Sequence, residues 1–583
     1  MEDKKVLLSV KDLEVKFRVR GRILTAIRGI DLDIYESESI AIVGESAAGK
    51  SVFTKTFSGM LDENGFISQG QIMFNDPELA DTTVKIDSRM AQKLIRRSEE
   101  RLNAAACYEN GAETYRSILA LDAEKNARMT LGAEEEQKFN DEIADLTFRK
   151  TEAFNLKQTL DSAADKEQIK TVTAEIKALE EQIEAKEAEK KKIIAQHQQS
   201  AKNDAEFQKY YSDTMAKLKA KYAEEQKKPI SDAVKQRNVI LAKEIYLSAG
   251  RYPLNKRIKL ISGLEKALAK AMQLGVDLND EAERNAVFDN VIFRVRYLDE
   301  TEDTLHGVCL LNLANIKNSQ DWGKIRGTKI ATIFQDPMTS LNPILTIGKQ
   351  ITSIILKHQN CSEVEARARA LELMDKVGIP NPEKRFDDYP FQYSGGMRQR
   401  IVIAIALSCQ PKILICDEPT TALDVTIQAQ ILKLLKDLQR EFNYTIVFIT
   451  HDLGVVANIA DRVAVLYAGQ IVELGTVEDV FYDPRHPYTW ALLSSLPQLA
   501  QKNTKLYSIT GTPPSLYNKI VGDPFAPRNP YCLKIDTLEA PPMFQISDTH
   551  FAKTWLLDPR APKIEKPEII QNIHEKLLSA FNI

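Results

Sequence analysis

Residues 44–51 read Gly-Glu-Ser-Ala-Ala-Gly-Lys-Ser, which fits the G-x-x-x-x-G-K-[ST] pattern of a phosphate-binding loop. The apolar run 40–43 before it predicts a buried strand, and residues 52–57 after it predict the start of a helix. In that setting the N–H groups at the helix start would face phosphates, Lys50 would reach the β- and γ-phosphates, and Ser51 would bind Mg²⁺. From these residues alone, a plain glycine turn at a helix start remains the alternative.

Composition narrows the class of protein. A chain of 583 residues suggests roughly three or four domain-sized units. With 43% hydrophobic and 27% charged residues, each unit can bury an ordinary core. A formal net charge of -4 argues against a nucleic-acid binder, which usually carries a basic face. We therefore expect no nucleic-acid partner.

Cysteine usage and apolar runs indicate the compartment. The six cysteines stand far apart, with no metal-ligand spacing and no disulfide framework, so we expect a reduced, cytosolic chain. We find no signal peptide at the N-terminus. The longest apolar run, 401–407, falls short of the about 20 residues that a membrane span requires. We expect a protein that is soluble on its own, with other chains spanning the membrane if it works there.

Polar residues follow the C-terminal ends of three strand-like runs. Residues 330–334 lead into Gln335, 412–416 into Asp417 and Glu418, and 445–449 into a Thr-His-Asp triplet that contains His451. Because these strands alternate with helices, we expect a mainly parallel α/β sheet with its ligand at the strand ends. Asp417 would hold Mg²⁺, Glu418 would act as general base toward water, and Gln335 and His451 would orient that water.

A second glycine pair opens another predicted helix. Residues 393–400 read Tyr-Ser-Gly-Gly-Met-Arg-Gln-Arg and precede an apolar helical run. Ser394, Gly395 and Gly396 therefore lie at a helix N-terminus, where free N–H groups favour an anion.

The amino-acid composition changes in the segment between the loop 44–51 and the strand that leads into Gln335. Proline is absent from 78 to 228 and glycine from 133 to 249. Apolar residues at 169, 172, 176, 179 and 183 follow the a/d spacing of a coiled coil. We expect a helical hairpin or short bundle with breaks at 161–165 and at Lys228-Pro229, and a further helix from Tyr252-Pro253 to Leu274. Its charges are a solvated face or a partner-binding arm, and His197 and His306 are expected to be solvated.

Taken together, these motifs resemble the ATP-binding-cassette family over residues 5–76 and 307–490. The resemblance implies ATP and Mg²⁺ as ligands and an α/β P-loop ATPase fold: a mainly parallel sheet, an antiparallel β subdomain and an α-helical signature subdomain, with an inserted helical region. It also implies that Phe17 stacks on adenine. The implied catalytic residues are Glu418, His451 and Gln335. The implied Mg²⁺ ligands are Ser51, Gln335 and Asp417. The implied ATP-binding residues are Phe17, Gly44, Glu45, Ser46, Ala47, Ala48, Gly49, Lys50, Ser51, Val52, Gln335, Ser394, Gly395, Gly396, Asp424 and His451.

Within that family, several stretches of the sequence are similar to those of the ATPase subunits of oligopeptide and dipeptide importers. The stretches 333–343, 394–400, 417–424 and 484–489 carry this likeness. It implies a subunit on the cytoplasmic face of the cell membrane. Its partners would be a second cassette, two membrane permeases and an extracytoplasmic peptide-binding protein. The sequence leaves open which peptides are carried and whether the second cassette is a copy or a homologue.

The resulting domain plan has four parts. Residues 1–76 and 307–490 form the nucleotide-binding domain, 77–306 a mainly helical and partly coiled-coil insertion, and 491–583 a C-terminal extension ending in an amphipathic helix. Three features depart from the family pattern. The insertion is one, and Tyr393 stands where the signature usually has leucine. In the third, Asp523 and Asn529 stand at two cysteine positions of an iron–sulfur motif, so we expect no cluster.

A rival class is a chromosome-maintenance ATPase, which also carries a coiled coil within its cassette. Two features weigh against it. The predicted coil precedes Gln335 instead of following it, and it is short. A translation-associated cassette protein is a further alternative, but such chains carry two cassettes, and only one is seen here.

Overall fold

The computed structural model describes residues 5–19, 22–132, scattered positions from 135 to 157, and 166–288, 291–317, 319–421, 423–496, 509, 511–517, 520–567, 570, 571 and 573. The chain forms two compact units. The first unit comprises Met1–Phe17, Leu24–Asp76 and Ile316–Ile583, and the second comprises Arg18–Ile23 and Pro77–Asn315. The proposed break at 161–165, Ala422 and most of the predicted C-terminal helix lie outside the described residues.

An eight-stranded sheet forms the centre of the first unit, in the order β13-β14-β12-β11-β3-β10-β9-β8. The parallel strands are β3 (Ser39–Val43), β8 (Ile330–Ile333), β9 (Ile413–Asp417), β10 (Thr445–Thr450) and β11 (Arg462–Tyr467). The antiparallel edge is made by β12 (Gln470–Thr476), β14 (Phe551–Ala552) and β13 (Phe544–Gln545). The near-continuous apolar runs of the five parallel strands suit strands that are covered on both faces of the sheet.

The strand register decides where the functional residues meet. Thr450 of β10 pairs with Val43 of β3, and Ile449 pairs with Asp417 of β9. On the next strand along, Ile333 of β8 pairs with Cys416. The carboxyl ends of four parallel strands are therefore level, and the loops that leave them open on one edge of the sheet.

Helices cover the sheet through two hydrophobic cores. One core packs α17 (Gly395–Leu407) and α18 (Val425–Phe442) onto β9 and β10, with Ile401, Leu435 and Phe448 fully buried. The other core packs α20 (Val477–Tyr482) and α21 (Pro487–Ser494) onto β3 and β11. The remaining α-helices described in this unit are α1 (Lys50–Ser58), α12 (Ser319–Trp322), α13 (Pro337–Ser340), α14 (Ile347–His358), α15 (Glu363–Lys376), α16 (Pro382–Arg385) and α19 (Leu453–Ile459).

The N-terminal part of the chain contributes three strands to a second sheet: β1 (Val6–Val19), β2 (Arg22–Tyr35) and β4 (Gly65–Phe74). They adjoin in the order β2-β1-β4, and β1 runs antiparallel to β4 with Leu8 opposite Phe74 and Phe17 opposite Gly65. The family resemblance implies an antiparallel β subdomain, and the antiparallel pairing of β1 with β4 agrees with that expectation.

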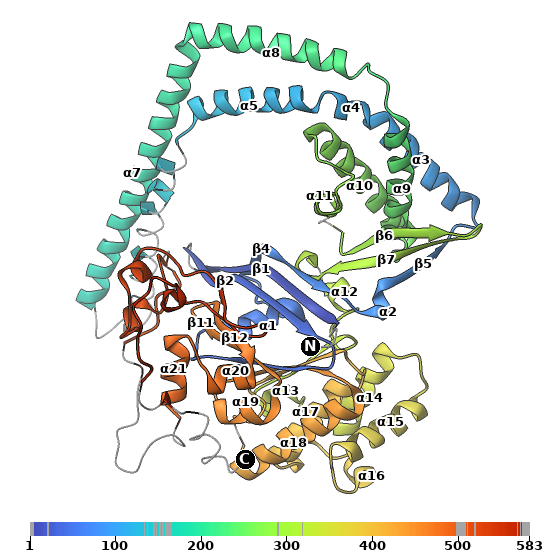
Figure 1. The fold of residues 1–583 in the computed structure, drawn as a ribbon, viewed down its shortest axis with the longest axis vertical. Helices are drawn as coiled ribbons and strands as arrows, with labels where there is room; N and C mark the ends of the chain where they lie inside the picture. The colour runs from blue at the N-terminus through green and yellow to red at the C-terminus, as the bar shows by residue number, and fades with distance from the viewer. Residues whose placement is uncertain are drawn as a thin grey trace. The chain divides into compact units, whose positions relative to one another are not determined.

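The second unit is mainly helical. Its helices are α2 (Pro77–Ala80), α3 (Arg89–Ala105), α4 (Cys107–Asn110), α5 (Ala112–Met129), α7 (Lys166–Asn203), α8 (Ala205–Glu225), α9 (Asp232–Ala249), α10 (Leu254–Leu274) and α11 (Glu281–Val287). Strands β5 (Asp81–Lys85) and β6 (Phe293–Glu300) both pair antiparallel with β7 (Thr304–Asn312). Figure 1 shows α5 alongside α8, and Ile118, Leu121 and Met215 fill the seam between them.

Helix ends in this unit test the sequence predictions. The break at Lys228-Pro229 lies between α8 and α9, and α10 ends at Leu274 as expected, capped by Gly275. A break that was not predicted separates α7 from α8 at Asp204, whose side chain accepts from Phe207 N at 3.0 Å and starts a new helix. On the predicted a/d seam, Val172 and Leu179 are buried. The coiled-coil pairing itself stays a prediction.

The two histidines of this unit are hydrogen-bonded. His306 lies between Thr83 and Thr304, at 3.1 and 2.9 Å, and His197 Nδ1 lies 3.0 Å from the Thr130 carbonyl oxygen. Within the described part of the chain, no helix combines the length and the apolar character that crossing a bilayer requires.

Candidate nucleotide site

The loop 44–51 connects β3 to α1 and has an unusual backbone. Gly44, Ala47 and Gly49 all have positive φ, at 156°, 65° and 103°. Only glycine fits at Gly44, because a Cβ there would lie 2.2 Å from the Leu466 carbonyl oxygen. The strand–loop–helix setting predicted from the sequence is therefore present, with the first turn of α1 opening toward the loop.

Lys50 lies folded against this loop. Its ammonium donates to the carbonyl oxygens of Gly44 at 2.8 Å and Glu45 at 3.0 Å. Burial lowers the pKa of Lys50, while the charges of Glu418, Asp417 and Glu45 oppose that shift. A cation held against a loop at a helix N-terminus suits a polyanionic ligand.

Ser51 and Asp417 form a pair of hard oxygen donors. The Ser51 hydroxyl donates to Asp417 Oδ1 at 3.1 Å across 366 residues of sequence. Burial raises the pKa of Asp417, and the neighbouring Glu418 adds to that rise, so a bound cation would favour the ionised carboxylate. Among the described residues no group of three or more acidic, histidine or cysteine side chains could hold a metal. A hydroxyl with one carboxylate fits Mg²⁺, which takes its other ligands from water and phosphate.

Glu418 is the centre of the strand-end cluster. It follows β9 with a φ of 46°, and its Oε2 accepts from Gln335 Nε2 and from Thr421 Oγ1, each at 3.1 Å. His451 Nδ1 lies 3.0 Å from Oε1 of the same carboxylate. The structure therefore brings Gln335, Glu418 and His451 together beside the Ser51–Asp417 pair. These side chains leave from the level ends of β8, β9 and β10, as the register requires.

The signature residues lie apart from this cluster. Ser394 caps α17, and its hydroxyl accepts from Met397 N at 3.4 Å. Gly396 lies against Ile427, whose Cγ2 would stand 2.7 Å from an added Cβ. Within the described parts of the chain, no hydrogen bond joins residues 394–396 to the loop 44–51. The two predicted anion-binding elements therefore share no hydrogen bond among the described residues.

Two further candidate ligands, Asp424 and Phe17, and the departure at Tyr393 have structural surroundings of their own. Asp424 caps α18 by accepting from the N–H groups of Thr426 and Ile427 at 3.0 and 3.1 Å. Phe17 is 9% exposed, and its ring lies against Gly65, so adenine stacking by Phe17 stays a prediction. Tyr393 is buried and donates to the Arg385 carbonyl at 2.7 Å, which leaves the Ser394 cap intact.

The loop 522–532 lacks the donors of an iron–sulfur site. Asp523 Oδ1 accepts from Phe525 N, and Asn529 Oδ1 accepts from Tyr531 N, each at 2.9 Å. Cys532 is the one cysteine in this stretch of sequence. These residues do not fit a cluster that needs four thiolates. Here the side chains at the two replaced positions form hydrogen-bonded turns.

Sequence reasoning missed two residues that reach the phosphate loop. Tyr488 and Arg528 both contact Glu45, the second residue of the loop, from more than 440 positions away. Tyr488 belongs to the importer-like stretch 484–489, a likeness that does not indicate a contact with the phosphate loop. No local spacing rule joins such distant positions. The one local signal is that Arg528 stands in a glycine- and proline-rich stretch, 522–530.

Comparison with known proteins shows the family of this chain. It belongs to the ABC transporter family, whose pattern matches residues 27–248 and 296–421. Residues 472–535 match the family described as "Oligopeptide/dipeptide transporter, C-terminal region". The resemblance drawn from the sequence motifs is thereby confirmed.

Named relatives share the cassette. The oligopeptide transport ATP-binding protein AmiE of Streptococcus pneumoniae serotype 4 is 65% identical over 46% of this chain and 75% of its own. The oligopeptide transport ATP-binding protein OppD of Bacillus subtilis is 58% identical over 45% and 74%. The dipeptide transport ATP-binding protein DppD of Lactococcus lactis subsp. cremoris is 61% identical over 43% and 72%.

Proposed function

We propose that this chain is the ATP-hydrolysing subunit of an importer of oligopeptides or dipeptides. The observation that carries the proposal is the meeting of Gln335, Glu418 and His451 beside Ser51 and Asp417 at one sheet edge. The substrate class is supported by the C-terminal match over residues 472–535 and by the names of the relatives.

The site residues divide the work of hydrolysis. The loop 44–51 and Lys50 bind the phosphates, and Phe17 stacks on adenine. Bound Mg²⁺ would neutralise charge on the phosphate oxygens, held by Ser51 and Asp417 with Gln335 as a further ligand. Glu418 accepts a proton from the attacking water, because the Gln335 amide and the Thr421 hydroxyl hold its carboxylate at the sheet edge where the phosphates would lie. His451 and Gln335 orient that water and contact the γ-phosphate.

A second cassette completes the site. Because residues 394–396 are separate from the chain's own loop, we infer that Ser394, Gly395 and Gly396 act in trans on the partner's nucleotide, with Asp424 lining the same interface. Charge-assisted contacts from two subunits to one γ-phosphate hold the closed pair, and hydrolysis releases it. Closure of the pair would drive two membrane permeases, to which an extracytoplasmic binding protein delivers the peptide. The subunit works at the cytoplasmic face of the membrane.

The second unit, including the predicted coiled coil, is proposed as a docking or regulatory arm. Its motivation is the contrast between many charged helical surfaces and the lack of a metal-type cluster among its described residues. Replacing residues 77–306 by a short linker should leave ATP binding intact while changing transport or its regulation. A folded deletion protein that no longer binds ATP would contradict this role.

The experiment for the proposed function is reconstitution. The chain is co-expressed with candidate permeases and a second cassette, purified as a complex and placed in vesicles, and ATP-driven uptake of labelled peptides is measured. The Glu418→Gln complex is the inactive control. Peptide uptake with the wild type alone supports the proposal. Co-purification with DNA or ribosomes, and no permease, would favour the rival classes instead.

A further inference from the structure

The second residue of the phosphate loop is held by the C-terminal part of the chain. The Glu45 N–H donates to the Tyr488 hydroxyl at 2.8 Å. The Glu45 carboxylate accepts from both terminal nitrogens of Arg528, at 2.8 and 3.1 Å. Main chain and side chain of one loop residue are thus both engaged, by residues 443 and 483 positions away.

This contact is largely buried and well formed. The Arg528 side chain is 5% exposed, and its Nη1 also donates to the Tyr467 hydroxyl at 3.2 Å. The hydrogen bond to Glu45 raises the pKa of Arg528 above its usual value. The Tyr467 and Tyr488 rings lie 4.6 Å apart, centre to centre, so the aromatic pair fixes the position of both hydroxyls. Two-pronged arginine–carboxylate pairs are among the stronger and more directional contacts.

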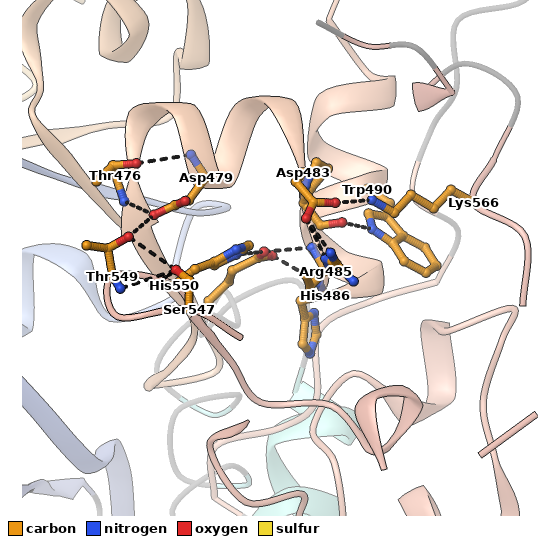
Figure 2. A network of polar contacts seen from close by, with 12 residues as sticks. Thr476, Asp479, Asp483, Arg485, His486, Trp490, Ser547, Thr549, His550 and Lys566 are labelled. Atoms are coloured by element: carbon orange, nitrogen blue, oxygen red, sulfur yellow. Dashed lines mark hydrogen bonds and ion pairs between the residues drawn. The ribbon is translucent and has the colours of Figure 1, made fainter. Parts of the chain in front are cut away.

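A polar network anchors Tyr488 in turn. Glu473 of β12 is fully buried and accepts from Arg485 N at 2.7 Å, His486 N at 3.0 Å and His550 Nε2 at 2.8 Å. His486 Nδ1 accepts from Tyr488 N at 3.0 Å and caps α21. Figure 2 shows Arg485, His486 and His550 converging in this network, with Trp490 tied to the same turn. The start of α21 is therefore fixed to the central sheet.

The loop needs such support because its own backbone is strained. Three residues of the loop have positive φ, and one of them, Ala47, is not glycine. The Lys50 ammonium donates to carbonyl oxygens of the same loop. The Glu45 N–H is not available to a phosphate while it donates to Tyr488. Its engagement instead orients the peptide units that follow, whose N–H groups line the helix start.

We propose that Arg528 and Tyr488 are positioning residues that hold the phosphate loop in its nucleotide-binding shape. The inference rests on the proposed function, in which this loop binds ATP. It links the region 472–535, shared with peptide-transporter proteins, directly to the nucleotide site of the same subunit. Neither residue touches the nucleotide in this account, because both act through Glu45.

The test is equilibrium binding of MgATP to the full chain by calorimetry, with the melting temperature measured without nucleotide. We expect Arg528→Met to raise the Kd about tenfold, equivalent to about 1.4 kcal/mol, and Tyr488→Phe to raise it about threefold. The matched control is Arg560→Met. Arg560 forms a two-pronged pair with Asp558 in the same C-terminal part but does not contact the loop, so its Kd should not change.

A double-mutant cycle separates positioning from general stability. If Arg528 acts through Glu45, the double variant of Glu45→Gln and Arg528→Met should bind no more weakly than the worse single variant. Arg528→Lys, which keeps the charge but not the fork, should recover part of the affinity. Tyr488→Phe removes a single oxygen and keeps the test valid if Arg528→Met does not fold.

The outcomes are distinguishable. If the wild type binds MgATP and both Arg528→Met and Tyr488→Phe bind it equally well, the positioning role is wrong while the proposed function stands. A lower melting temperature with an unchanged Kd would equally overturn the role, because it would show general stabilisation only. If the wild type itself does not bind MgATP, the proposed function and the inference both fail.

Discussion

Two carboxylates, half-buried Glu418 in the first unit and buried Glu244 in the second, have opposite surroundings. Glu418 in the first unit is bonded to Gln335, Thr421 and His451 at the open edge of the sheet. Glu244 in the second unit is 1% exposed and accepts from Arg294 at 2.9 Å, with Arg284 at 3.8 Å. Burial lowers the pKa of Arg294, and Glu244 counteracts that shift. One carboxylate lies among amide, hydroxyl and imidazole groups, whereas the other is ion-paired with arginine.

The two units use their acidic side chains differently. In the second unit these acids form ion pairs and hydrogen bonds that stabilise the fold: Glu265 accepts from Ser98 at 2.8 Å and from Arg101, and Arg237 binds Glu109. In the first unit, the strand-end carboxylates face hydroxyl, amide and imidazole groups. For this pair of acids, chemistry is therefore expected at Glu418, which has no guanidinium among its described partners, and stability at Glu244, which has one.

The largest expected effect is on the stability of the second unit. Glu244→Gln should lower the free energy of unfolding by about 3 kcal/mol, because it leaves the Arg294 guanidinium buried without its counter-charge. Chemical denaturation monitored by circular dichroism measures this. The matched control, Glu300→Gln, breaks an exposed pair with Lys243 and should cost under about 1 kcal/mol. An equal loss for both variants would contradict the comparison.

A slightly smaller effect is expected on ligand binding in the first unit. Lys50→Met should weaken MgATP binding about a hundredfold, since it removes the charge that the loop directs at the phosphates. The control is Lys55→Met one turn further along α1, where the lysine pairs weakly with Asp62 at 3.9 Å. Calorimetric titration separates the two variants. Binding by Lys50→Met as tight as by Lys55→Met would break the assignment of the loop.

The smallest effect concerns pH. Burial lowers the pKa of His486 to about 3, so the folded chain binds fewer protons than the unfolded chain between about pH 3 and pH 6.5. Stability should therefore fall as the pH drops through that window, by about 2 kcal/mol at pH 5 from this group. His486→Asn keeps a capping oxygen for α21 and should flatten the fall. An unchanged pH profile of unfolding would show that His486 is not the buried neutral base described.

Much of the site could be predicted because its parts are local. Residues 44–51 carry their own strand, turn and helix signals, and Gln335, Glu418 and His451 each directly follow an apolar strand. Parallel strands have a shared polarity, so their ends coincide once the register is set. The Glu45–Arg528 and Glu45–Tyr488 contacts had no such signal, because they join segments by tertiary packing alone. The helix break at Asp204 was missed because an N-cap aspartate within a polar helical run looks like any other surface charge.

The central claim is that Glu418 activates water at a site that otherwise only binds ATP. The most direct measurement is single-turnover hydrolysis of MgATP by wild type and Glu418→Gln, with the bound nucleotide quantified in parallel. The account predicts that the variant binds MgATP within about threefold of the wild type but hydrolyses it at least about a hundredfold more slowly. It should accumulate as an ATP-bound pair of cassettes. Hydrolysis by Glu418→Gln at the wild-type rate would contradict the account.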